Sequence, residues 1–508
     1  MTSAGHFWKL PFTPPWLLVA AVALALLGWL LPSARRVPER RLRGAAIFLG
    51  ITAATFFARH LLLTPGFFHQ HGQGPVWARY GIIHPSSCQY GPGFHDLYSF
   101  IGSYGRIDPE RLLFPAQALL GALIPAFTFV LARRAGARLP VALAAAFAVA
   151  VDPIFARIAE SESYYDTCAF LLFFAASALA CGASRASLRS PRFHLCALAA
   201  GLLVAQAARV HPVAWAPAAL LPLVVILIRG RLLDRIALAA CAAVIIAACV
   251  GLFAGPAIKF VLAGRMGDTW GPSLTVSPLR RVLGPLAILA VTGAAAVVLP
   301  RSRDLLLRAG AALFALSFAQ AANVMASMEP PWIFGAYARL YAPVLLCALA
   351  ALAAQLLPPN GQRRVAFVLA CAALLHTAIR GPWLMRSTVD AREARWVLDL
   401  RRTLLPGTTG LAYLGQTSTG NVFLPMFTNF PFHAGDRAFL PPGVRVPYYL
   451  RSSLCSTEEG RPTCDAFERA HPDMTPVAEQ RFSTIPEDEV PYFENPVRVI
   501  LYRLPDPR

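Results

Sequence analysis

Apolar residues gather along this chain in runs about as long as a bilayer is thick, separated by polar loops. A helix needs about 20 apolar residues to cross the hydrocarbon core of a membrane. Runs near that length occur at 16–32, 44–62, 114–132, 140–157, 166–182, 193–208, 212–228, 236–256, 282–299, 305–325, 340–357 and 365–379. The pattern therefore predicts an α-helical polytopic membrane protein with about twelve spans.

Arginines occupy every second loop between these runs. The basic loops lie at 35–43, 133–138, 185–192, 229–235, 301–308 and 363–364. Short loops rich in Arg and Lys remain on the cytoplasmic side of a membrane. The intervening loops, which are longer and hold more acidic residues, are then predicted to lie outside together with both chain ends. We expect the polar chemistry on that outer side.

Composition supports a membrane protein and argues against a nucleic-acid partner. Hydrophobic residues make up 56% of the chain, charged residues only 14%, and the mean hydropathy is +0.53. A soluble domain typically has about 25% charged residues. The formal net charge of +19 is spread over the predicted cytoplasmic loops. Because no single basic domain collects it, we predict contact with membrane lipids and no nucleic acid.

The chain divides into a multi-span region, 1–380, and a more polar region, 381–508. The second region opens with apolar residues at helical spacing from Val389, and the runs 410–415 and 497–504 are typical of strands;. We therefore predict a small extracytoplasmic α/β domain. Its cysteines, Cys455 and Cys464, bracket a short polar loop, and an oxidising compartment would favour a disulfide between them;.

The outer loop 63–113 is long and rich in histidine and tyrosine, and loops of this length are usually functional;. His69 and His71 form a His-x-His pair, and a neutral imidazole can act as a base. Asp96 is an acidic candidate in the same loop. The histidine spacing matches no zinc motif, so we assign no metal ligand, and a divalent metal cofactor is left open.

A second outer segment carries several carboxylates. Glu160 and Glu162 follow Asp152 within a few helical turns, and Asp166 comes next. Carboxylates grouped at the outer end of a helical bundle can supply a general base or bind a divalent cation. The alternative is a solvated polar loop in which Asp152 caps a helix end before Pro153.

Basic side chains also mark the outer ends of three spans. Arg157, Arg209, His211 and Arg339 lie there. Arginine binds phosphate oxygens through two hydrogen bonds, so these residues are candidates for binding a lipid-linked phosphate. The alternatives are side chains that extend to the membrane interface or pair with the carboxylates near Glu160.

Four segments in this order resemble the GT-C membrane glycosyltransferases, in particular the bacterial Rgt-type, aminoarabinose and mannosyl transferases. The segments are QYGPGF at 89–94, DPIFAR…E…YY at 152–165, ARVHP at 208–212 and YARLYAPVLL at 337–346. The resemblance covers roughly residues 44–357 and implies a bacterial plasma-membrane enzyme with its C-terminal domain outside. It implies transfer of a hexosyl or pentosyl group from a polyprenyl-phosphate sugar to a lipid, glycan or protein acceptor.

The sequence departs from the family at the expected catalytic base. The family places an acidic residue early in the first outer loop, whereas residues 67–73 here read FFHQHGQ. The catalytic candidates are therefore Asp96, His71, Glu160 and Glu162. The resemblance and the residue types together give the substrate-binding candidates His69, Tyr90, Arg157, Tyr164, Arg209, His211 and Arg339.

Two other classes of function remain compatible with this sequence. A non-catalytic assembly or binding protein on the same scaffold would explain the missing carboxylate in the first outer loop. A transporter or flippase would be expected to have charged or broken helices near the bilayer midplane. The interiors of the predicted spans are nearly free of charge, which favours the transferase over the transporter.

Overall fold

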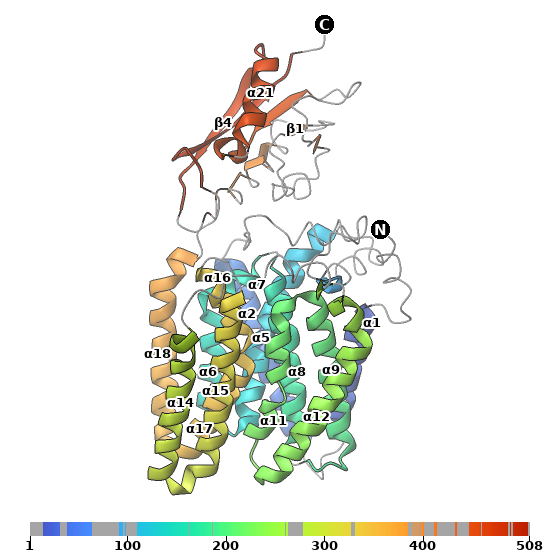
Figure 1. Cartoon of the computed structure of the whole chain (residues 1–508), viewed down its shortest axis with the longest axis vertical. Coiled ribbons are helices and arrows are strands. Elements are labelled where there is room, and N and C mark those ends of the chain that lie inside the picture. Colours follow the sequence, from blue (N-terminus) through green and yellow to red (C-terminus); the bar gives the residue numbers. More distant parts are fainter. Residues whose placement is uncertain are drawn as a thin grey trace.

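A computed structural model gives a helical bundle with a small sheet-containing part beyond one of its ends (Figure 1). The structure describes residues 14–30, 38–62, 91–94, 97, 109–161, 163–184, 186–259, 261–262, 278–326, 331–384, 389, 392–393, 396–397, 399–400, 411–413, 432–433, 447–458, 460–485, 488 and 491–505. The chain is a multi-pass α-helical membrane protein, as its apolar pattern predicts.

Each predicted apolar run falls on helix. The helices of the bundle are α1 (Pro14–Leu30), α2 (Pro38–Leu62), α5 (Pro109–Ala135), α6 (Leu139–Val151), α7 (Pro153–Ala159), α8 (Tyr164–Ala183), α9 (Pro191–Val210), η3 (Pro212–Ala214), α10 (Trp215–Leu220), α11 (Leu223–Leu227), α12 (Leu232–Phe253), α14 (Pro278–Val298), η4 (Pro300–Ser302), α15 (Arg303–Ala326), α16 (Pro331–Leu340), α17 (Ala342–Leu356) and α18 (Pro359–Leu384). Many begin at proline, whose fixed φ and missing N–H suit the first helical position.

Fewer helices qualify as full spans than the twelve runs predict. In the described part of the chain, six helices are long and apolar enough to cross a bilayer, or up to eight if each bent pair counts as one. The helices over Trp16–Leu30, Pro212–Leu227 and Ala342–Leu356 are apolar but shorter. The run at 140–157 is broken into α6 and α7, because a proline interrupts its hydrogen bonds;.

Arginines from the basic loops cap helix ends at the rim of the bundle opposite the sheet. Arg235 donates to the carbonyl of Ala183 at the end of α8. Arg308 donates to Ile226 in α11 over 3.0 Å, and Arg229 donates to a carbonyl near the end of α17 over 3.3 Å. The last carbonyls of a helix lack main-chain donors and carry partial negative charge. These arginines therefore also stabilise the bundle.

A five-stranded sheet follows the bundle, in the order β2-β1-β3-β5-β4. Its strands are β1 (Leu411–Tyr413), β2 (Phe432–His433), β3 (Tyr448–Arg451), β4 (Thr475–Phe482) and β5 (Val497–Arg503). β1 is parallel to β2 and β3, whereas β5 is antiparallel to β3 and β4. Val389, Val397 and Leu400, from the predicted amphipathic stretch, are buried against one face of this sheet. The predicted α/β organisation of this part is confirmed.

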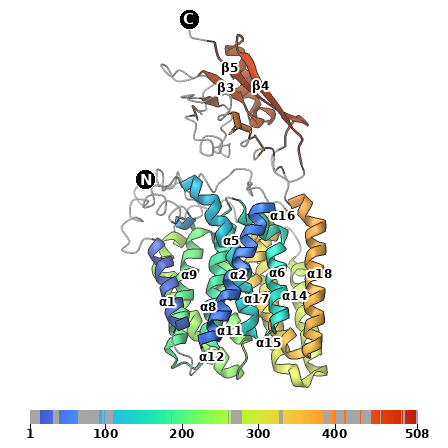
Figure 2. The same ribbon diagram turned by 180° about the vertical axis from the view of Figure 1, so that it is seen from behind.

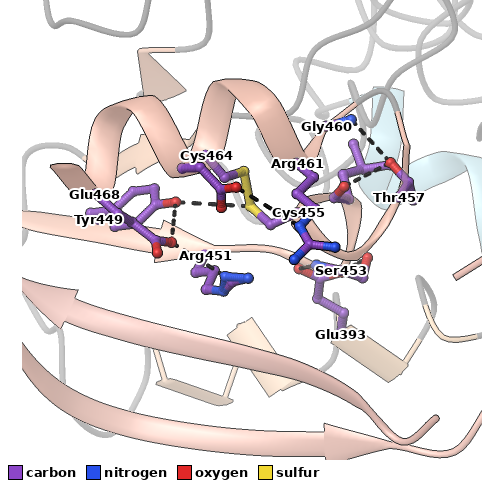
Figure 3. Close-up of a disulfide and its surroundings, with 12 residues drawn as sticks. Glu393, Tyr449, Arg451, Ser453, Cys455, Thr457, Gly460, Arg461, Cys464 and Glu468 are labelled. Atoms are coloured by element: carbon purple, nitrogen blue, oxygen red, sulfur yellow. Dashed lines mark hydrogen bonds and ion pairs between the residues drawn. A yellow bond between two sulfur atoms is a disulfide. The ribbon is translucent and has the colours of Figure 1, made fainter. Parts of the chain in front are cut away.

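The other face of the sheet carries α21 (Arg461–Ala470) and η5 (Ser453–Ser456), joined by a disulfide between Cys455 and Cys464 (Figure 3). The Cα atoms of the two cysteines are 5.7 Å apart, and both side chains are buried with Phe467. Below them, Glu468 accepts hydrogen bonds of 3.3 Å from Tyr449 and 3.3 Å from Arg451. Burial raises the pKa of Glu468, and these two partners oppose that rise.

We predict that replacing both Cys455 and Cys464 by alanine destabilises the C-terminal part by about 2–4 kcal/mol, because the disulfide restricts the unfolded chain. The purified full-length protein is heated, and the unfolding of the C-terminal part is monitored by the protease sensitivity of residues 389–505. The control is Cys371→Ala, a free and exposed cysteine in α18. Equal melting of the double variant, the control and the wild type would contradict the prediction.

Candidate functional site

The helix break between α6 and α7 is the centre of the candidate site. The two helices meet at 59° around Asp152. Pro153 has no N–H, and the N–H groups of Ile154 and Phe155 donate to Asp152 Oδ1 over 3.0 and 2.9 Å. In an unbroken helix, the N–H groups of residues 153–155 would donate to the carbonyls of residues 149–151. The break therefore removes the main-chain donors of three consecutive carbonyls.

Side chains from two other helices supply the missing donors. Arg59 of α2 donates through Nη2 to Val149 over 3.2 Å and to Ala150 over 2.9 Å, and its Nε also reaches Ala150 at 3.2 Å. The Thr377 hydroxyl of α18 lies 2.8 Å from the Val151 carbonyl and also 2.8 Å from the Ala373 carbonyl of its own helix, so its one proton is shared between two acceptors. Each of the three carbonyls left by the break therefore has a side-chain donor within hydrogen-bond distance, as buried backbone groups require.

Arg59 lies in a tight, charged pocket on the side of α5. Its Nη1 donates to the carbonyl of Gly121 over 3.2 Å. A Cβ atom on Gly121 would lie 2.2 Å from Ala159 Cβ and 2.8 Å from Asp166 Oδ1, so only glycine allows α5 and α7 this close. The charge of Arg59 is within electrostatic reach of Glu160 and the fully buried Asp166. These carboxylates offset the cost of burying a cation.

Asp152 also fixes Arg339 at the end of α16. Arg339 Nε donates to Asp152 Oδ1 over 3.2 Å, and its Nη2 donates to Oδ2 over 2.6 Å. The side chains of Arg339 and Asp152 are 21% and 16% exposed. Both carboxylate oxygens are occupied. Asp152 caps the start of α7, whereas the sequence interpretation has it at a helix end before Pro153, and it positions the arginine;.

The remaining candidates of α7 are buried beside this pair. Arg157 lies in the last turn of α7, and Glu160 is its C-cap residue. Figure 1 shows α7 and α16 at the rim that faces the sheet. Arg157 is within electrostatic reach of Asp488, a carboxylate of the sheet-containing part whose pKa is raised by burial. That part of the chain therefore comes close to α7.

An aromatic cluster connects α8, α9 and α16. The Tyr164 ring stacks on the His211 ring with centroids 4.3 Å apart, and Tyr165 meets Tyr337 edge to face at 5.2 Å. The Tyr165 hydroxyl donates to that of Tyr337 over 3.0 Å. His211 Nδ1 accepts from the Val213 N–H over 3.1 Å, which assigns the proton of the neutral ring to Nε2;.

Residues 91–94 of the long outer loop rest on the end of α9. Gly91 has a φ of +119° and Gly93 follows it, and a Cβ on either would lie 2.3 to 2.7 Å from main-chain atoms of Arg209 or Val210. Gln206 donates to the Gly93 carbonyl over 3.1 Å. Arg209 itself donates to Phe253 at the end of α12 over 3.0 Å. Glycine is thus needed where the loop meets the bundle.

The structure places only some of the predicted site residues. Around α7, Arg339 binds Asp152, while Arg157 and Glu160 occupy the last turn and the C-cap of the helix. Tyr164 stacks on His211 where α8 meets the end of α9, whereas Arg209, in the last turn of α9, donates to Phe253 of α12. His69, His71, Tyr90, Asp96 and Glu162 lie outside the described residues. Among the residues that are described, no group of three or more His, Cys, Asp or Glu side chains is arranged to hold a metal ion.

Several residues of the site escaped prediction from the sequence. They are Arg59, Gln117, Tyr165, Tyr337 and Thr377. Gln117 donates to the Ser163 carbonyl over 2.6 Å and accepts from Thr167, which ties α5 to the start of α8. One signal was available for Arg59, because a charged residue inside an apolar run must find partners within the bundle.

Fold and site together define a helical membrane protein with a polar centre at one rim. No protein-family model matches the chain, and no curated protein matches it. Apo ArnT from Cupriavidus metallidurans is similar over 90% of this chain and 97% of that one, at 14% identity and a TM-score of 0.48. ArnT bound to undecaprenyl phosphate has the same coverage and identity with a TM-score of 0.47. The arabinofuranosyltransferase AftD from Mycobacteria is similar over 97% of this chain and 42% of that chain, at 15% identity and a TM-score of 0.38.

We predict that Gly93→Ala destabilises the protein by about 1–3 kcal/mol, because the added methyl group overlaps main-chain atoms of α9;. The midpoint of thermal unfolding of the purified protein measures the effect. Gly251→Ala is the matched control, because a Cβ there would meet nothing within 4 Å. A control that melts lower than Gly93→Ala would show that the close approach is unimportant.

Proposed function

We propose that this chain is a GT-C-type glycosyltransferase that takes a sugar from a polyprenyl-phosphate donor at the outer face of the membrane. The observation that carries the proposal is the Arg339–Asp152 pair at the helix break. It presents a guanidinium, anchored through two hydrogen bonds, at the rim of a membrane-embedded bundle. Arginine in this setting suits a phosphate that is attached to a lipid tail.

The arrangement around α7 has the parts that such a transfer requires. The departing polyprenyl phosphate gains negative charge, which Arg339 and the buried Arg157 would stabilise;. A direct displacement at the anomeric carbon needs one base to take the proton of the acceptor hydroxyl. Glu160 is a buried carboxylate at the C-cap of α7, three residues after Arg157 in the chain. We assign it the role of base, with His71, Asp96 and Glu162 as the candidates outside the described residues.

The same geometry supports a lipid-linked phosphate donor, whereas the acceptor class stays broad. A donor with its tail in the bilayer and its phosphate at the α7 rim would place the sugar outside the apolar part of the bundle. The acceptor would be a lipid, a glycan or a protein that reaches this rim. Asp488, between β4 and β5, is within electrostatic reach of Arg157, so we propose that the C-terminal part takes part in binding the acceptor.

We predict that the purified protein binds undecaprenyl phosphate, the lipid present in one ArnT structure, and that Arg339→Gln weakens binding at least tenfold. Loss of charge-assisted hydrogen bonds costs about 1.5–3 kcal/mol. Native mass spectrometry measures the affinity, with the exposed Arg301→Gln at the opposite rim as the control. Glu160→Gln should retain binding but stop release of undecaprenyl phosphate from polyprenyl-phosphate sugars in the presence of membrane acceptors.

Two outcomes of this experiment would contradict the proposal. Absence of undecaprenyl phosphate binding by the wild type would exclude the donor class. Binding by the wild type with no release of undecaprenyl phosphate from any sugar-linked donor would favour a non-catalytic binding protein on this scaffold.

We predict the orientation of the chain from the basic loops, which should remain in the cytoplasm. Alkaline phosphatase fused after residue 505 should be active, because that enzyme folds only outside. The same reporter inserted at η4, between Arg301 and Arg303, should be inactive. The reverse pattern would place α7 on the cytoplasmic side and would exclude a reaction at the outer face of the membrane.

A further inference from the structure

We infer that Arg59 is a positioning residue that holds the broken end of α6 and thereby sets Arg339, acting through Asp152. The ligand-binding part of this inference rests on the proposed function, whereas the structural part does not. Arg59 touches no group of Arg339 directly. Its connection runs through Val149 and Ala150, which precede Asp152 in the chain.

The shape of the arginine side chain fits this role. Its three nitrogens make four hydrogen bonds to three carbonyls on two helices, α5 and α6. The residue is only 4% exposed. A planar guanidinium can span carbonyls that point from different directions, whereas a lysine ammonium is a single point. Its positive charge also suits the end of α6, where carbonyl dipoles leave partial negative charge.

If Arg59 is removed, the neighbouring residues cannot restore a continuous helix or replace the donors that Arg59 supplies. Pro153 cannot donate, and the N–H groups after it are already bonded to Asp152. Gly121 holds α7 at contact distance from α5, so a shift of α7 toward α5 would produce overlap with Ala159. Without Arg59, the carbonyls of residues 149 and 150 would be buried and unbonded. The chain could then satisfy them only by rotating residues 149–152, which moves the Asp152 carboxylate.

Asp152 transmits such a movement to Arg339. The pair is held by two hydrogen bonds in a fixed relative orientation, so the guanidinium follows the carboxylate;. Thr377 reaches Val151 alone among the three carbonyls and shares its single hydroxyl proton with the Ala373 carbonyl, so its loss should have a smaller effect in the same direction. The inference therefore predicts a graded series, with Arg59→Gln most severe, Arg59→Lys intermediate and Thr377→Val mildest.

Two readouts on the full-length purified protein test the inference. The first is amide hydrogen exchange of peptides that cover residues 149–160. The second is affinity for undecaprenyl phosphate by native mass spectrometry. The matched control is Arg235→Gln, which removes an equally buried arginine that caps a helix at the opposite rim. Arg59→Gln should speed exchange in 149–160 at least tenfold and weaken lipid binding about tenfold, whereas Arg235→Gln should leave both within twofold.

The series separates positioning from a general loss of stability. If Arg59→Gln fails to fold, Thr377→Val must still speed exchange selectively in 149–160, and an unchanged pattern in that variant overturns the inference. Equal effects of Arg59→Gln and Arg235→Gln on both readouts also overturn it. If the wild type does not bind the lipid, the proposed function fails, and the exchange data decide the positioning role alone.

Discussion

Three carbonyl groups at the end of α6 impose the constraint on which the candidate site depends. Asp152 and Pro153 deprive residues 149–151 of their main-chain donors, and buried carbonyls must then find donors elsewhere;. Arg59 and Thr377 must therefore reach in from α2 and α18. The same carboxylate that breaks the helix holds Arg339, so the scaffold and the candidate site share one set of hydrogen bonds.

Arginine has the same physical role elsewhere in the bundle. Arg209 caps the end of α12 at the upper rim, while Arg235 and Arg308 bond to carbonyls of α8 and α11 at the lower one. The chain has only two lysines, Lys9 and Lys259. The planar guanidinium of arginine carries five N–H donors and stays charged when buried, so arginine suits these positions. The basic loops consequently combine a topological signal with structural caps. Figure 2 shows the helices of the bundle from the side opposite to Figure 1.

The sequence predicted local features well, because they depend on neighbours along the chain. The apolar runs fall on helices, and the stretch after Val389 packs on the predicted sheet. The pattern predicts about twelve spans, some of them short, and the structure divides the predicted run 140–157 into α6 and α7 at Asp152. A short break near a span end changes the hydropathy of the run very little.

Features that depend on distant contacts could not be read from the pattern. Arg59 bonds to residues about 90 positions away, and Tyr165 bonds to Tyr337 on another helix. Which helices are neighbours is decided by packing of similar apolar faces, and periodicity carries no such information. Glu160, Arg157 and Arg339 are predicted site residues from their type and outer placement, whereas the bonds that place Arg339 on Asp152, next to the helix end that Arg59 binds, required the structure.

The most direct measurement is a cryo-electron microscopy structure of the full-length protein bound to undecaprenyl phosphate. The account predicts phosphate density about 3 Å from the Arg339 guanidinium at the rim formed by α7 and α16, with Arg59 still bonded to the end of α6. A phosphate bound at the opposite rim, near Arg235 and Arg308, would contradict it, as would an Arg339 side chain separated from Asp152 in the complex.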